Sequence, residues 1–186
     1  MAKSQSTKNT PSWRDVKSRL VRWERTDLID LLRDMYAASH DNKAFLQTRL
    51  SLGNDLLLPY KEIISCWVNP SDPRRPVSIS HAKKAIADYK KALGKPEGMA
   101  ELSVFYCEEV FNFLDECGVQ DPGYFDALAH MFAQALNYVL VLPDTEQLPF
   151  LDRLNRLRLL GEVTGMGVGD DLADLWSQAG IADYFF

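Results

Sequence analysis

The sequence lacks the features that identify several large classes of protein. It contains no run of about 18 apolar residues, which is the length that a helix needs to cross a membrane. It has only three cysteines, Cys66, Cys107 and Cys117, and none of them lies at a CxxC spacing. An odd number of cysteines in a chain of 186 residues argues against a disulfide framework. We therefore expect a cytoplasmic protein with reduced, buried thiols and no membrane partner.

The sequence also lacks any motif of a catalytic, metal-binding or nucleotide-binding site. The three histidines, His40, His81 and His130, are far apart and have no partner at the spacing of metal ligands. His130 shares a helical face with Asp126 and Gln134, which could orient its imidazole, but such a stripe is more often an exposed polar face. We expect no cofactor and no metal. If the protein is an enzyme, its catalytic site is one that no known sequence motif reveals, and this stays an alternative interpretation.

Charge is distributed unevenly along the chain, and the net charge of −5 conceals this. Residues 1–95 carry 18 Lys and Arg against 10 Asp and Glu, a net +8, whereas residues 96–186 carry 3 against 16, a net −13. This asymmetry indicates either an interaction surface or two halves that pack as one body through attracting faces. It also permits self-association, because the basic face of one copy can meet the acidic face of another.

Helical periodicity dominates the sequence, and strand patterns are nearly absent. Apolar residues recur at helical spacing in one segment after another, and short Gly, Pro, Asn or Asp-rich breaks separate the segments. The strongest segment is 96–117, whose apolar arc spans about 200° and predicts a central helix with several neighbours. The pattern predicts an all-α protein, an antiparallel array of eight to ten helices of the kind that can form an α-solenoid-like superhelix.

One helical domain is expected over residues 12–180. The first eleven residues are polar and lack the apolar stretch of a secretory signal, so 1–11 is expected to be a disordered tail. Residues 181–186 form a second tail. Three prolines within 69–76 exclude regular structure there, because proline removes a hydrogen-bond donor and restricts its predecessor. The segment 69–77 is therefore the candidate junction between two helical subunits.

The segment 74–91 is the candidate binding surface. Its six cations are expected on one loop and on the outer face of the helix that follows: Arg74, Arg75, Lys83, Lys84, Lys90 and Lys91. They suit an acidic protein surface or the phosphates of a nucleic acid. Nucleic acid is not favoured, because the chain is acidic as a whole and carries no recognition motif. A solvated helix face, with Asp88 paired to Lys84, is the third interpretation.

The glycine-rich segment 161–169 is expected to be a loop. Its later glycines, which the predicted loop needs for structural reasons, are Gly165, Gly167 and Gly169. A phosphate-binding run is excluded, because no strand precedes the glycines and Asp170 and Asp171 follow them. The glycines instead predict left-handed backbone or close approach to a neighbouring segment. The aspartates lack the spacing of a calcium loop and are interpreted as helix caps.

Three stretches, in order along the chain, form a recognisable set: 26–36 (TDLIDLLRDMY), 78–92 (SISHAKKAIADYKKA) and 164–176 (TGMGVGDDLADLW). Together they resemble a family of small, all-helical bacterial proteins that carries only a domain-of-unknown-function label. The similarity extends over about residues 12 to 178, and the loop at 69–76 and the glycines near 165–169 depart from it. The resemblance implies a bacterial, cytoplasmic, helical protein and supplies no substrate, cofactor or catalytic residue.

The sequence thus favours a non-enzymatic adaptor or scaffold that presents a basic and an acidic face to an unidentified protein partner. A helical array offers extended surfaces suited to this role, although a fold does not by itself specify a function. Binding of nucleic acid or another anionic ligand through 74–91 is the first alternative. An enzyme with an unrecognised site is the second.

Overall fold

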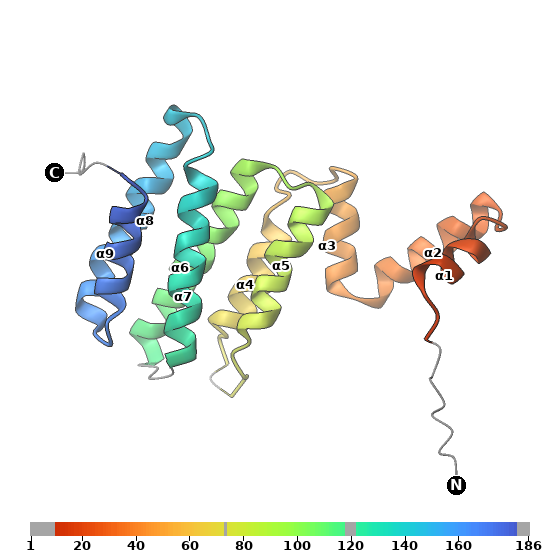
Figure 1. Ribbon diagram of the computed structural model, residues 1–186. Helices are drawn as coiled ribbons and strands as arrows, with labels where there is room; N and C mark the ends of the chain where they lie inside the picture. Colours follow the sequence, from red (N-terminus) through yellow and green to blue (C-terminus); the bar gives the residue numbers. More distant parts are fainter. Residues whose placement is uncertain (1–9, 73, 118–121, 182–186) are drawn as a thin grey trace, which may run out of the picture. The chain divides into compact units, whose positions relative to one another are not determined.

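The structure is a computed structural model that describes residues 10–72, 74–117 and 122–181. The tails expected at 1–11 and 181–186 lie almost wholly outside these residues, as does the side chain of Cys117. Within the described ranges the chain forms nine helices and no strand, so the all-α prediction is confirmed (Figure 1). The helices are α1 (Trp13–Leu20), α2 (Arg25–Ala38), α3 (His40–Arg49), α4 (Leu58–Val68), α5 (Ile79–Ala92), α6 (Pro96–Cys117), α7 (Pro122–Val139), α8 (Asp144–Thr164) and α9 (Val168–Gln178).

The chain divides into two compact units, residues 1–43 and 44–186, and the boundary falls within α3. The proline-rich loop at 69–77, which the sequence marks as a candidate junction, lies inside the second unit. The backbone N–H of Ser78 donates to the Trp67 carbonyl at 2.8 Å across the base of this loop. The Tyr124 hydroxyl of α7 donates to the Val68 carbonyl at 3.0 Å. These two hydrogen bonds attach the end of α4 to both α5 and α7.

Side-chain caps mark the starts of two helices, α1 and α3. The backbone N–H of Ser12 donates to the Asp15 carboxylate at 2.8 Å, which forms a capping box at the start of α1. At the start of α3 the Ser39 hydroxyl accepts the backbone N–H of Asn42 at 3.1 Å. Local side-chain chemistry therefore explains where α1 and α3 begin.

The second unit consists of three successive helical hairpins, α4–α5, α6–α7 and α8–α9. Helices α4, α6 and α8 pack side by side in one layer, and α5, α7 and α9 lie on the other side of them (Figure 1). Consecutive helices run antiparallel, as is usual when short loops join them. Hairpins stacked in this way resemble an α-solenoid, although the sequence contains no detectable repeat.

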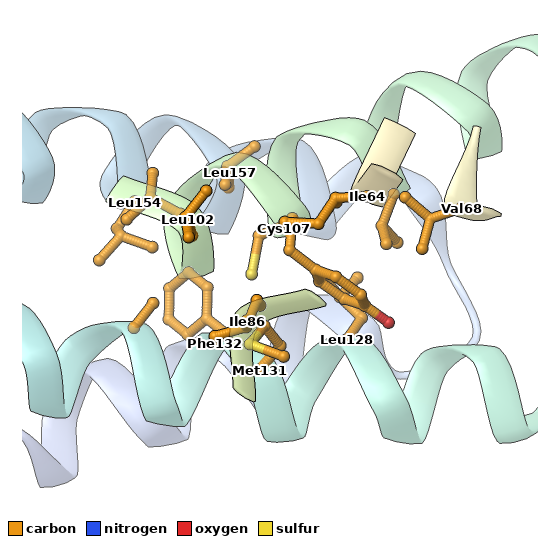
Figure 2. Close-up of a cluster of buried hydrophobic side chains, with 14 of the residues drawn as sticks. Ile64, Val68, Ile86, Leu102, Cys107, Leu128, Met131, Phe132, Leu154 and Leu157 are labelled. Atoms are coloured by element: carbon orange, nitrogen blue, oxygen red, sulfur yellow. The ribbon is translucent and has the colours of Figure 1, made fainter. Parts of the chain in front are cut away.

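Helix α6 is the central helix of the second unit, as its wide apolar arc predicts. It packs against α4, α5, α7 and α8. Leu102 and Cys107 of α6 and Leu128 and Phe132 of α7 are fully buried in the core that these helices share (Figure 2). Burial raises the pKa of the Cys107 thiol, and nearby Glu108 raises it further. This thiol therefore stays protonated and serves as an apolar core residue, as the sequence predicts.

The prediction of a loop over residues 161–169 is wrong, because two helices occupy most of that segment. Helix α8 continues to Thr164 and α9 begins at Val168, so only residues 165–167 lie outside a helix. Gly165 and Gly167 each have a φ of +79°, a conformation that glycine adopts most readily. Gly169 instead lies within α9, where a Cβ would stand 2.8 Å from the Glu162 Cα of α8.

The aspartates that follow the glycines do not cap α9. Its N-cap is Gly167, so the prediction that Asp170 or Asp171 caps the helix is wrong. Both lie in the first turn instead, where a carboxylate interacts favourably with the positive end of the helix dipole. Glycine can take the N-cap position here because the chain turns through a left-handed conformation directly after α8.

Replacing Gly169 with alanine should lower the free energy of unfolding by about 2 kcal/mol, because the new Cβ meets the backbone of α8, which cannot rotate away. Gly167→Asn is the matched control: space around Gly167 is open, and asparagine tolerates its left-handed φ at a cost of about 0.5 kcal/mol. Urea unfolding followed by circular dichroism measures both values. A Gly169→Ala loss no larger than that of the control would contradict the close packing of α8 and α9.

Candidate functional site

The lysines of segment 74–91 lie where the sequence predicts them, on the outer face of α5. Lys84, Lys90 and Lys91 are exposed and surround the exposed side chain of Ala87, while Lys83 is half-buried at the edge of the same face. The opposite face of α5 is buried in the core of the second unit. These four lysines with Ala87 are termed the lysine face below.

Local ion pairs neutralise part of the positive charge of segment 74–91. The carboxylate of Asp88 accepts hydrogen bonds from Lys84 at 2.5 Å and from Lys91 at 3.3 Å. Arg74 donates through Nε and Nη2 to Asp72 at 3.0 and 3.1 Å, and this contact lowers the pKa of that carboxyl. Half of the six predicted cations therefore face a carboxylate close to them in sequence, which reduces the charge available to a partner.

Arg75 is separated from the lysine face and turns toward α4. Its Nη1 lies 3.1 Å from the Sγ of Cys66, beside a hollow of about 450 Å³ that is also lined by Ser65 and Phe105. Cys66 is only half-buried, whereas the sequence predicts a buried thiol. The structure therefore brings the four lysines together but assigns Arg75 to a different surface.

An acidic groove lies between α7 and α9. It has a volume of about 550 Å³, and its polar lining consists of Asp126, His130, Asp171, Asp174 and Gln178. The sequence placed Asp126 and His130 on one helical face, but only the packing of α9 against α7 adds the two aspartates from α9. In the part of the chain that the structure describes, no group of three or more His, Cys, Asp or Glu side chains is arranged to hold a metal ion.

Two glutamates of α6 are bound to the neighbouring helices. Arg153 of α8 donates through Nη1 to Glu101 at 2.5 Å, and through Nε and Nη2 to Glu108 at 2.7 Å each. Lys61 of α4 lies 2.6 Å from Glu101. Burial by itself raises the pKa of Glu101, but the hydrogen bonds from Arg153 and Lys61 outweigh it and leave that pKa lowered. The cluster joins α4, α6 and α8, and Lys61–Glu101 joins the basic and acidic halves of the sequence.

Helices α1 and α2 carry a large exposed apolar surface, which the sequence pattern does not reveal. Neither helix has a buried residue, and the two make little contact with each other. Eight large apolar side chains in this region are between 37% and 75% exposed: Trp13, Val16, Val21, Trp23, Ile29, Leu32, Met35 and Tyr36. Their helical spacing is visible in the sequence, but their exposure is not, because periodicity alone cannot tell a covered stripe from an uncovered one.

The fold and these surfaces place the chain among all-α helical-array proteins. Comparison with protein-family models, curated proteins and solved structures gives no match. Over the described ranges, no helix is both long and apolar enough to pass through a membrane.

Proposed function

We propose that this chain is a protein-interaction adaptor. Helices α1 and α2 bind a protein partner, and the helical array of residues 44–186 is the folded domain to which this binding segment is attached. The supporting observation is the exposure of the large apolar side chains of α1 and α2. Helices of 8 and 14 residues are marginal in water on their own and gain most of their stability by burying an apolar face. Exposed apolar patches of this kind mark protein-binding surfaces in folded proteins.

The residue pattern of α2 suits recognition of an apolar groove or helix. Ile29, Leu32 and Tyr36 stand at positions i, i+3 and i+7, which place them on one side of the helix. The other side carries Asp30 and Asp34, which are more than half exposed. Such a helix binds through one apolar face and keeps its charged face in water.

The lysine face of α5 is the second candidate for the binding surface. Three of its lysines are exposed, and a single carboxylate, Asp88, accepts hydrogen bonds from two of them. The net charge of −5 favours an acidic protein over nucleic acid as its partner, since a dedicated nucleic-acid binder is usually basic as a whole. This face contributes charge alone, whereas α1 and α2 offer the apolar area that drives most stable association.

Site-specific photo-crosslinking in bacterial cells tests the proposal, with the host chosen because the resemblance described above points to a bacterial protein. A photoreactive amino acid is placed at Leu32, at Ala87 and, as a matched control on the charged side of α2, at Asp34. We expect covalent protein adducts from Leu32, few from Asp34, and no effect of nuclease on them. Adducts from Ala87 alone would move the binding surface to α5, and their loss on nuclease treatment would identify nucleic acid. No excess of adducts at Leu32 over Asp34 would overturn the proposal.

A further inference from the structure

We infer that the partner of α1 and α2 is a second copy of this chain, so that the two helices of each copy associate as a four-helix interface related by a twofold axis. The inference deepens the adaptor function and rests on it.

The exposed apolar area matches what one side of a stable dimer buries. The side chains on the apolar stripes of the two helices and of the residue that follows α1 are Trp13, Val16, Trp23, Ile29, Leu32, Met35 and Tyr36, which are 37% to 70% exposed. A fully exposed aromatic side chain presents about 150–250 Å² and an aliphatic one less, so at these exposed fractions the seven present roughly 600 Å². Two copies would bury about 1,200 Å² in total, which lies at the lower end of the range of specific protein interfaces and above the roughly 1,000 Å² that such an interface needs.

The charges of α1 and α2 complement each other, and both helices are present in every copy. Helix α1 carries Arg14, Lys17 and Arg19 against Asp15, a net +2. Helix α2 carries three aspartates and two arginines, a net −1. In a twofold pair, a contact between α1 of one copy and α2 of the other occurs twice, so a favourable interaction between them is doubled. The opposite net charges of the two helices attract at longer range, while Asp30 and Asp34 stay in water outside the apolar contact.

The charges of α2 argue against a lipid surface as the partner of that helix. Residues 1–43 contain nine Lys and Arg against six Asp and Glu, a net charge of +3, so the repulsion between two copies of this unit is small at physiological salt. An amphipathic helix that binds anionic lipid carries mainly Lys and Arg on its polar face. The polar face of α2 instead carries Asp30 and Asp34, with Arg33 paired to both.

Sedimentation velocity of the full-length chain tests the inference. We expect the wild type to sediment as a dimer at micromolar concentration and to dissociate on dilution. Leu32→Glu places a charge in the interface twice, once from each copy, and should raise the dissociation constant by about a hundredfold or more. Asp34→Asn, on the charged side of the same helix, should leave the dimer intact. Equal thermal unfolding of the second unit in all three proteins separates loss of the interface from loss of folding.

Photo-crosslinking from Leu32 in the purified protein provides the second measurement, and a covalent product of twice the chain mass is expected. A wild type that stays monomeric at about 100 µM, with no such product, would overturn self-association. If adducts to other proteins still form from Leu32 in cells, the adaptor function survives that result. If none form, the adaptor function fails as well. A dimer that Leu32→Glu leaves unchanged would also overturn the inference, because the interface would then lie elsewhere.

Discussion

Replacing Phe132 with alanine should lower the free energy of unfolding of the second unit by about 4 kcal/mol. The ring is fully buried between α6 and α7, near Leu102, Cys107 and Leu128 (Figure 2). Removing it loses the transfer free energy of the ring and leaves a cavity that the surrounding helices can fill only in part. Urea unfolding followed by circular dichroism measures the loss. We expect no other single substitution proposed for this chain to have a larger effect.

The control for this substitution is Asn137→Ala, at an exposed position of the same helix. We expect it to change the free energy of unfolding by less than about 0.5 kcal/mol, because an exposed side chain in a helix contributes little packing. A loss of less than about 1.5 kcal/mol for Phe132→Ala would contradict the placement of α7 against α6.

The second large effect is expected at Arg153, whose replacement with methionine should cost about 3 kcal/mol at neutral pH. Methionine keeps much of the apolar stem but removes the guanidinium that binds Glu101 and Glu108. Both carboxylates are largely withdrawn from water, at 19% and 30% exposure, and only Lys61 would remain close to Glu101. Unpaired charges at partly buried positions are costly because they lose hydration without gaining a partner.

Arg156→Met is the matched control for Arg153→Met. Arg156 lies on the same helix, pairs with Asp152 one turn away and is 73% exposed. An exposed pair of this kind contributes less than about 0.5 kcal/mol. Equal losses for the two variants would show that the Glu101–Glu108 cluster does not hold α8 against α6.

The contribution of Arg153 should depend on pH in a defined direction. The pKa of Glu101 is lower in the folded chain than its ordinary value of 4.5. The stability that its ionised form contributes is therefore fully present above pH 4.5 and is lost as the pH falls through the folded pKa. The difference in unfolding free energy between wild type and Arg153→Met should shrink between pH 7 and about pH 3, as measured by urea unfolding. A difference that is constant over this range would contradict the role of Glu101.

The sequence predicted those features that depend on residues close together along the chain. The helical spacing of apolar residues predicted the all-α fold and the central position of α6, since a wide apolar arc needs several neighbouring helices. The same periodicity placed Lys83, Lys84, Lys90 and Lys91 on one outer face of α5. Helix formation and capping act within a few residues, so a local pattern is sufficient to predict them.

The tertiary structure decided every feature that joins residues far apart in sequence. Glu101 and Arg153 are 52 positions apart, and no spacing rule connects them. Gly169 belongs to a helix and not to the predicted loop, because its small size is needed for contact with α8 and not for a turn. Within the first unit, the exposure of the apolar sides of α1 and α2 likewise follows from the little contact that these two helices make with each other. A sequence pattern shows which face of a helix is apolar, but only the arrangement of the helices in space shows whether another face covers it.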